Sequence, residues 1–168
     1  DFLEWYTPVE VGGRIIQERT FPKYKERREF MSNKKRGKSK WDFIIEKNLP
    51  DVRGKTICDL GCNIGLFSIY LSRLGAAKVD GFDRAQTVIQ PSNPKLPRHS
   101  IIQQAYFVRN LFRLTGKNVP NNVNFIECDL ATLDFSSLQY DLLFSCCVLY
   151  HFGDQFEVFI RQVSQNIP

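Results

Sequence analysis

The chain has 168 residues, 43% of them apolar and 13% aromatic, and it carries a formal net charge of +5. This composition is typical of a globular protein, and the length suits one domain. The sequence argues against a membrane span and against export, because it has no long apolar run and no basic-then-apolar stretch at its start. We therefore expect a cytoplasmic protein. The first residue, Asp1 rather than Met, suggests a fragment of a longer chain.

Five cysteines are present, and most of them lie in apolar runs without C-x-x-C spacing. They are Cys58, Cys62, Cys128, Cys146 and Cys147. We interpret them as reduced core residues and expect no metal site.

The first forty residues are expected to form an N-terminal region, followed by one domain over 41–168. Apolar residues alternate weakly around Gly12-Gly13, with Val9 before and Ile15 after this pair. The pattern predicts a short β-hairpin.

A basic segment runs from Lys23 to Lys40. Such charged stretches are usually solvated connections, and we favour that interpretation. Because Tyr24 and Phe30 interrupt the basic residues, an RNA-contacting surface remains the alternative.

The rest of the chain alternates between helical and strand patterns. Helices are predicted over 40–49, 65–75, 101–116 and 156–166, and strands over 55–60, 77–83, 122–129 and 140–150, with a proline-rich loop over 91–100. This alternation predicts βα units, a parallel sheet and an α/β fold with helices on both faces.

The fourth strand is apolar on both faces, so we expect it to lie inside the sheet. Only one helix follows it. Its next neighbour must therefore come from chain that is missing, from the N-terminal hairpin or from another molecule, and we favour missing C-terminal strands. An uncovered edge would also favour a homodimer.

Glycines lie at the turn between the first central strand and its helix, where the fold places a ligand crevice. Gly61 and Gly65 occupy this turn. A dinucleotide fingerprint would have glycine in place of Asn63 and Leu66, which disfavours an NAD-dependent dehydrogenase. Asp59, two positions before the first glycine, suits a cationic ligand better than a pyrophosphate.

Two further carboxylates follow the next strands, Asp83 and Asp129. Asp83 lies at a spacing where a carboxylate accepts ribose hydroxyls, and Asp129 could receive an exocyclic amine. The structural alternatives are a helix cap for Asp83 and a closed turn for Asp129.

Together, the stretches ICDLGCNIG, GFD, ECDLATLDF and YDLLFSCCVLYH resemble the class I S-adenosylmethionine-dependent methyltransferases, from about Lys40 to the end of the chain. The resemblance implies S-adenosylmethionine as cofactor and a Rossmann-like sheet. It implies that Asp83 binds the ribose and that Asp129 and Leu130 flank the adenine. The residues at the methionine end would be Asp59, Gly61, Cys62, Asn63 and Gly65. We add Arg84 and Cys146 to the expected cofactor site.

A narrower resemblance links KWDFIIEKNLPDVRGKTICDLGC and FSCCVLYH to the wobble-uridine tRNA methyltransferases and carboxymethyltransferases. It implies that Lys40 and Tyr150 would grip the carboxylate of a carboxylated cofactor. Tyr150 and His151 lie at the crevice end of the fourth strand, where either could contact substrate or act as general base. We expect methyl transfer to an oxygen or nitrogen of a small molecule or tRNA nucleoside. The alternative is a non-catalytic RNA- or protein-binding module.

Overall fold

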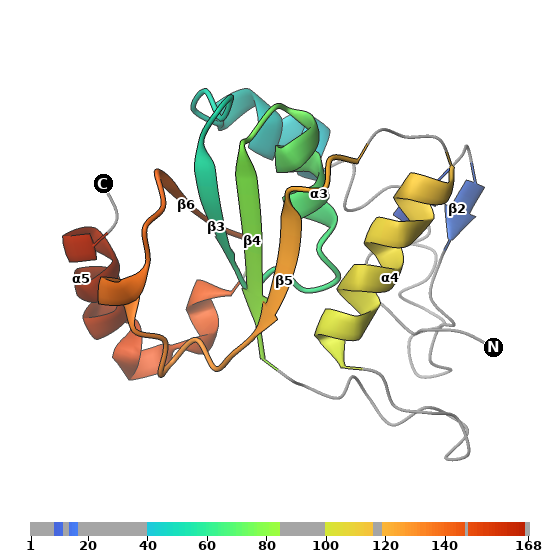
Figure 1. The fold of residues 1–168 in the computed structure, drawn as a ribbon. Helices are drawn as coiled ribbons and strands as arrows, with labels where there is room; N and C mark the ends of the chain where they lie inside the picture. The colour runs from blue at the N-terminus through green and yellow to red at the C-terminus, as the bar shows by residue number, and fades with distance from the viewer. Residues whose placement is uncertain are drawn as a thin grey trace, which may run out of the picture.

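A four-stranded parallel sheet with the strand order β5-β4-β3-β6 forms the centre of the computed structural model (Figure 1). The structure describes residues 9–11, 14–16, 40–84, 100–115, 119–146 and 148–166. The central strands are β3 (Thr56–Leu60), β4 (Lys78–Asp83), β5 (Val123–Glu127) and β6 (Leu142–Ser145). The α-helices are α3 (Leu66–Arg73), α4 (Ile101–Leu114) and α5 (Phe156–Asn166). Single-turn helices lie at Phe135–Ser137, Leu149–His151 and Gly153–Gln155.

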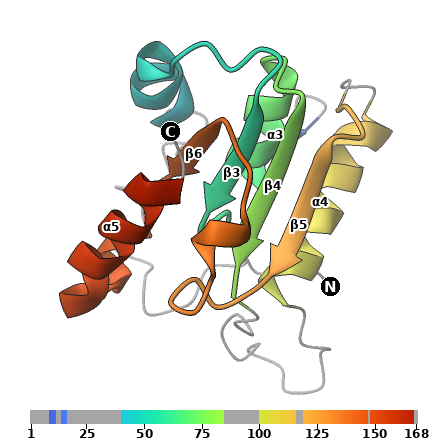
Figure 2. The same ribbon diagram turned by 60° about the vertical axis from the view of Figure 1, so that its left-hand side comes forward.

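Helices cover both faces of this sheet, as the sequence predicts (Figures 1 and 2). Successive strand residues point to opposite faces. Ile57 and Val79 face α3 and α4 in one apolar cluster. Cys58 and Leu60 face the other way, against Phe159 of α5. The predicted doubly covered α/β fold is therefore confirmed.

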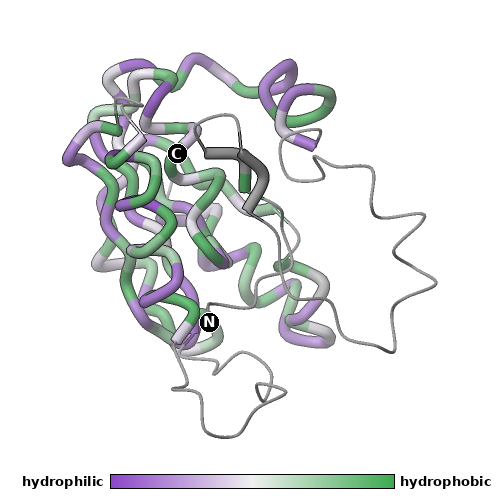
Figure 3. Tube along the Cα trace, turned by 90° about the vertical axis from the view of Figure 1, so that its right-hand side faces the viewer, coloured by the Kyte–Doolittle hydropathy of each residue, from purple (hydrophilic) through white to green (hydrophobic). Residues whose placement is uncertain are grey.

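The helices have one buried side each, so hydrophilic and hydrophobic residues alternate along their turns (Figure 3). In α4 the buried stripe includes Ala105, Val108 and Phe112. The helix begins at a capping box, in which Ser100 and Gln103 each accept a hydrogen bond from the other's backbone N–H. Local sequence signals thus fix both the position and the orientation of α4.

The predicted hairpin is present as β1 (Val9–Val11) and β2 (Arg14–Ile16). Val9 is buried against Val108 and Phe112 of α4. Since the hairpin packs there and does not enter the central sheet, it is not the neighbour of β6. The basic residues before Lys40 and the proline-rich loop before Ser100 lie outside the described residues.

The fourth central strand differs from its prediction over 140–150. β6 is only four residues long. No described strand pairs with its outer edge, in agreement with the expectation that its next neighbour comes from elsewhere. The apolar run does not continue as a strand because the chain turns into the short helix Leu149–His151. Val148 and Leu149 pack there with the cluster around Phe159.

The predicted helix over 40–49 is a π-helical turn, Trp41–Ile45, followed by the 3-10 turn Glu46–Asn48. Trp41 is buried and stacks on Phe67 of α3. Ile44, which we placed on the same apolar stripe, is exposed. The wider π-helical turn moves Ile44 away from the side that carries Trp41.

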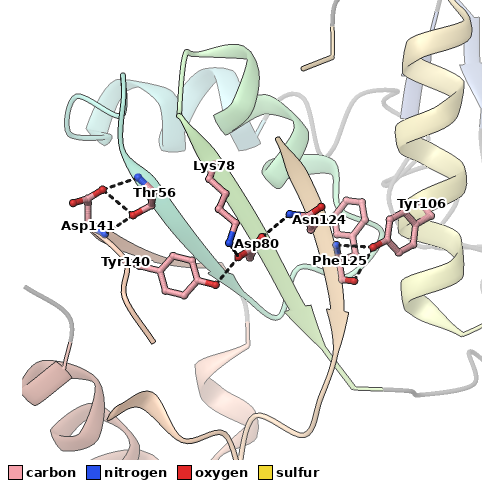
Figure 4. Close-up of polar contacts among 8 residues, drawn as sticks. All are labelled: Thr56, Lys78, Asp80, Tyr106, Asn124, Phe125, Tyr140 and Asp141. Atoms are coloured by element: carbon pink, nitrogen blue, oxygen red, sulfur yellow. Dashed lines mark hydrogen bonds and ion pairs between the residues drawn. The ribbon is translucent and has the colours of Figure 1, made fainter. Parts of the chain in front are cut away.

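A buried carboxylate joins three elements on the α5 side of the sheet (Figure 4). Asp80 of β4 accepts hydrogen bonds from Tyr140 at 2.6 Å and Asn124 at 2.9 Å, and it pairs with Lys78 at 2.6 Å. Burial raises the pKa of Asp80, but these three donors lower it more, so that it lies below its ordinary value. We assign Asp80 a structural role because its carboxylate is satisfied by its neighbours.

The outer edge of β5 is covered by side chains of α4. The Tyr106 hydroxyl accepts a hydrogen bond from Phe125 N–H and donates one to Phe125 O, and Arg109 donates to Val123 O (Figure 4 shows the Tyr106 contacts). These bonds occupy backbone groups that another strand would need. A further strand therefore cannot pair with these positions of β5.

Candidate functional site

The candidate site lies at the carboxyl ends of the parallel strands. Leu60 pairs with Phe82, and Asp83 pairs with Glu127, so β3, β4 and β5 end at the same side of the sheet. The glycine turn, residues 61–65, leads from β3 into α3 at this position. The fold thus brings the turn beside Asp83, as expected.

Three residues of the glycine turn have left-handed backbone. The φ angles are +72° at Gly61, +51° at Asn63 and +72° at Gly65. Asn63 is the only residue other than glycine with positive φ in the described part of the chain. Asparagine tolerates this conformation, and here its Oδ1 accepts a hydrogen bond from Ile64 N–H at 2.7 Å. Asn63 therefore takes the backbone role that a glycine would otherwise have.

Close packing also requires the two glycines. A Cβ on Gly61 would lie 2.5 Å from Val148 Cβ, and one on Gly65 would lie 2.2 Å from Phe125 Cζ. We did not single out Gly81 from the sequence, although a glycine inside a strand often marks such a close approach. A Cβ there would lie 2.8 Å from Cys62 Cβ, so Gly81 makes room for the buried Cys62 side chain.

Every backbone N–H of the glycine turn already has an acceptor within the protein. Gly61 and Cys62 donate to Phe82 O, Asn63 donates to Asp83, Ile64 donates to Asn63 Oδ1, and Gly65 donates to Cys62 O. A pyrophosphate cradle needs free N–H groups at such a turn. The geometry therefore disfavours a dinucleotide site of that kind, in line with the missing fingerprint.

Two predicted cofactor carboxylates, Asp59 and Asp83, adjoin the turn, and Asp83 is the more exposed to solvent. Its Oδ2 accepts from Asn63 N–H and its Oδ1 from Arg84 N–H, both at 2.8 Å. Burial raises its pKa above the ordinary value, while these N–H groups and the charges of Arg84 and His151 lower it. Each carboxylate oxygen has further acceptor capacity. Asp83 is thus held in place and still partly exposed.

Asp59 lies beneath the turn and is only 2% exposed. Its Oδ2 accepts a hydrogen bond from Ser68 of α3 at 2.5 Å. Burial raises the pKa of Asp59 to about 7, although the bond from Ser68 lowers it and the charge of Asp83 raises it further. This carboxyl joins β3 to α3 and is not open to a cationic ligand in the way we expected from its position.

The other predicted cofactor residues have different environments. Asp129 accepts a hydrogen bond from Ala131 N–H at 3.0 Å, so it closes a turn, which was its structural alternative. Leu130 is buried against Phe135. Cys146 and Lys40 are half-buried, and Lys40 precedes the buried Trp41.

The expected catalytic residues follow β6. Tyr150 and His151 belong to the short helix Leu149–His151, and His151 is exposed. The side chain of Val148, the residue before this helix, packs onto Gly61. The same turn therefore lies beside the segment that carries His151. Sequence reasoning missed Val148 because only the fold brings it to Gly61.

In the described part of the chain, no group of three or more His, Cys, Asp or Glu side chains is placed to hold a metal ion. No described helix is long and apolar enough to cross a membrane.

Comparison with known proteins identifies the class. A family described as "Methyltransferase domain" matches residues 17–168. The chain belongs to this family, which confirms the class that the motifs predict.

Individual relatives agree with this assignment. The chain is 29% identical over 119 residues to a tRNA U34 carboxymethyltransferase of Desulfotalea psychrophila, covering 69% of this chain and 30% of that protein. It is 39% identical over 54 residues to a ribosomal protein L11 methyltransferase of Aeromonas hydrophila, covering 32% of this chain and 18% of that protein.

Among solved structures, an S-adenosylmethionine-dependent methyltransferase from Mesorhizobium loti has a similar fold, with a TM-score of 0.55 and 23% identity. The match covers 79% of this chain and 49% of that chain. The chain thus spans half or less of the length of these proteins.

We expect Gly65→Ala to lower the free energy of unfolding by more than the strain of a left-handed alanine accounts for. Gly54 provides a matched control, because it has the same φ of +72° but open space around a Cβ. Gly54→Ala should cost about 1–2 kcal/mol. Gly65→Ala should cost roughly 1–3 kcal/mol more, since its methyl group would overlap the Phe125 ring. Urea unfolding measures both, and equal losses would contradict this role of Phe125.

We also expect Asp59 to make stability depend on pH. Between about pH 4 and pH 7 the folded protein keeps a proton that an unfolded aspartate has released, so stability falls as pH rises through this range. Asp59→Asn removes this effect. Its stability relative to wild type should therefore rise across the range, by up to roughly 4 kcal/mol at about 1.4 kcal/mol for each pH unit.

Urea unfolding at several pH values from 4 to 8 measures this difference. Asp51→Asn is the control, because the hydrogen bond from Arg53 lowers the pKa of exposed Asp51 to about 2, and its effect should be constant over this range. A constant difference for Asp59→Asn as well would contradict the assignment.

Proposed function

We propose that this chain is the cofactor-binding part of an S-adenosylmethionine-dependent methyltransferase. The observation that carries the proposal is the position of Asp83, which is partly exposed at a strand end and fixed by Asn63 N–H. Membership of the methyltransferase-domain family supports it. We place the reaction in the cytoplasm.

The residues present fit this cofactor. Asp83 would accept hydrogen bonds from the ribose hydroxyls through its remaining lone pairs. Asn63 exposes its side chain at the turn, where the methionine end would lie. Asp129 and Leu130 would flank the adenine. Four residues would shape the turn rather than bind the cofactor directly, because their contacts are made within the protein. They are Asp59, Gly61, Cys62 and Gly65.

When bound, S-adenosylmethionine would supply a methyl group on a sulfonium. The protein's own contribution is mainly orientation, since well-aligned reactants reach effective molarities of about 10⁵ M or more. Val148 would help to exclude water on the β6 side. For a hydroxyl acceptor, a proton must also be removed, and we assign this step to His151, with Tyr150 contacting the acceptor.

We propose a tRNA nucleoside as the acceptor. The similarity to a tRNA U34 carboxymethyltransferase supports this choice over a small molecule. If the cofactor is carboxylated, Lys40 and Tyr150 would bind its carboxylate, and Arg84 and Cys146 would lie nearby. The basic segment that ends at Lys40 would be a separate region preceding the methyltransferase domain.

Asp83→Asn should weaken S-adenosylhomocysteine binding by tenfold or more, because a hydrogen bond to a charged group is lost. Isothermal titration calorimetry measures this, with NAD as a ligand expected not to bind. Asp51→Asn, at the opposite end of β3, should bind like wild type. Equal affinity of Asp83→Asn and wild type would contradict the proposal.

Failure of the folded wild-type chain to bind S-adenosylhomocysteine would favour the non-catalytic module. Binding of NAD would favour a dehydrogenase.

We further propose that β6 mediates a homodimer through its outer edge. The β5 edge is occupied by Tyr106 and Arg109, whereas no described strand pairs with the outer edge of β6. Light scattering should give twice the chain mass of 19.6 kDa at high concentration. A monomer at all concentrations would contradict this proposal.

A further inference from the structure

Two arginines lie one helical turn apart on α4, away from the glycine turn. Arg109 donates through Nη1 to Val123 O at 2.8 Å, and its guanidinium lies 4.6 Å from the centroid of the Tyr106 ring. Arg113 donates through Nη2 to Pro120 O at 3.5 Å. Both side chains are half-buried, and the 2.8 Å bond orients Arg109 at the β5 edge.

Neither arginine has a carboxylate partner among the described residues, in contrast to others on the surface. Arg53 pairs with Asp51, and Arg161 pairs with Glu157. Burial and the neighbouring charge of Arg113 lower the pKa of Arg109. Like charges at this helical spacing disfavour each other. The pair therefore concentrates positive charge without a described counter-charge.

Part of the hydrogen-bonding capacity of this pair is unused. Within the described structure, the Nε atoms of both residues are buried and have no acceptor. A guanidinium has five N–H donors, and each arginine donates to one acceptor among the described residues. The buried Nε atoms cannot reach an anion in solution, so an anion would be bound by the Nη group of each residue that has no described acceptor.

We propose that Arg109 and Arg113 bind the phosphate backbone of RNA. Arginine suits phosphate because its guanidinium stays charged and each Nη group carries two N–H donors. The net charge of +5 lies in residues 1–40, whereas residues 41–168 carry equal numbers of basic and acidic side chains. The choice of RNA over an isolated phosphate therefore follows from the proposed tRNA acceptor and from the pairing of the two arginines. The contact would be independent of base sequence, since phosphate contacts position the RNA and do not read it.

The pair would act as a docking site at a distance from the reaction. Arg113 is twelve residues after Ile101, the first residue of α4, which corresponds to about 18 Å along the helix. A structured RNA is large enough to contact this surface and the strand ends together. This inference rests on the proposed RNA acceptor, and it assigns part of the binding to α4 rather than to the basic segment before Lys40.

The test is the salt dependence of RNA binding by the full chain. Fluorescence anisotropy with a labelled tRNA anticodon stem-loop, from 50 to 200 mM salt, gives the slope of log affinity against log salt. Each phosphate contact contributes about 0.7–0.9 to that slope. Arg113→Gln should reduce the slope by about this amount, and Arg109→Gln with Arg113→Gln by about twice as much.

Two controls separate the arginine pair from general effects. Arg161→Gln removes one positive charge on α5 and should leave the slope unchanged. Arg113→Lys keeps the charge and should keep most of the slope. Arg113→Gln is the decisive single variant, because its 3.5 Å contact contributes little to the fold. Thermal unfolding checks that each variant is folded.

An unchanged slope in folded Arg113→Gln and in the double variant would overturn the inference, as would no RNA binding by wild type. Competition by millimolar inorganic phosphate at constant ionic strength would also overturn it, in favour of a small-anion site. Parallel calorimetry with S-adenosylhomocysteine distinguishes the two proposals. If the arginine variants lose RNA binding, they should still bind S-adenosylhomocysteine. If the cofactor proposal is wrong, calorimetry shows no S-adenosylhomocysteine binding, whatever the salt dependence of RNA binding.

Discussion

The site depends on the left-handed backbone at the end of β3. Gly61, Asn63 and Gly65 reverse the chain so that α3 returns across the sheet, and this reversal places Asn63 N–H against Asp83. The two glycines also admit Phe125 of β5 and Val148, which follows β6, from opposite sides of β3. This short turn therefore contacts residues of β4, of β5 and of the segment after β6 at the end of the sheet where a ligand would bind.

Three aspartates of β3 and β4 differ because of their surroundings. Asp59 is buried with one hydroxyl partner, so burial raises its pKa to about 7. Asp80 is equally buried, but Lys78, Tyr140 and Asn124 lower its pKa below the ordinary value. Asp83 is partly open and fixed by backbone N–H groups. Of the three, Asp83 alone combines a fixed position with access for a ligand.

Much of the fold could be predicted because local signals and tertiary packing agree. The apolar stripe and capping box of α4 define that helix, and the glycine turn marks the start of α3. The extent of β6 could not be predicted, because the apolar residues Val148 and Leu149 suit a buried turn as well as a strand. Ile44 was misplaced because a helical period does not reveal a π-helical turn.

The candidate site was predictable in position but not in the partners of each side chain. Spacing located Asp59 and Asp83 at strand ends. It could not show that Ser68 donates a hydrogen bond to Asp59, or that Asn63 adopts a left-handed backbone conformation. Those facts depend on how α3 returns over β3. The arginine pair likewise needed the structure, since only the packing of α4 beside β5 shows what each arginine contacts.

We propose that the cofactor binds at the glycine turn and Asp83. Nuclear magnetic resonance of the ¹⁵N-labelled chain during titration with S-adenosylhomocysteine tests it most directly. We expect saturable shifts centred on the backbone amides of Asn63, Arg84 and Ala131, with little change at Asn124. Shifts centred on the Asp80 side of the sheet, or no shifts in a well-folded chain, would contradict it.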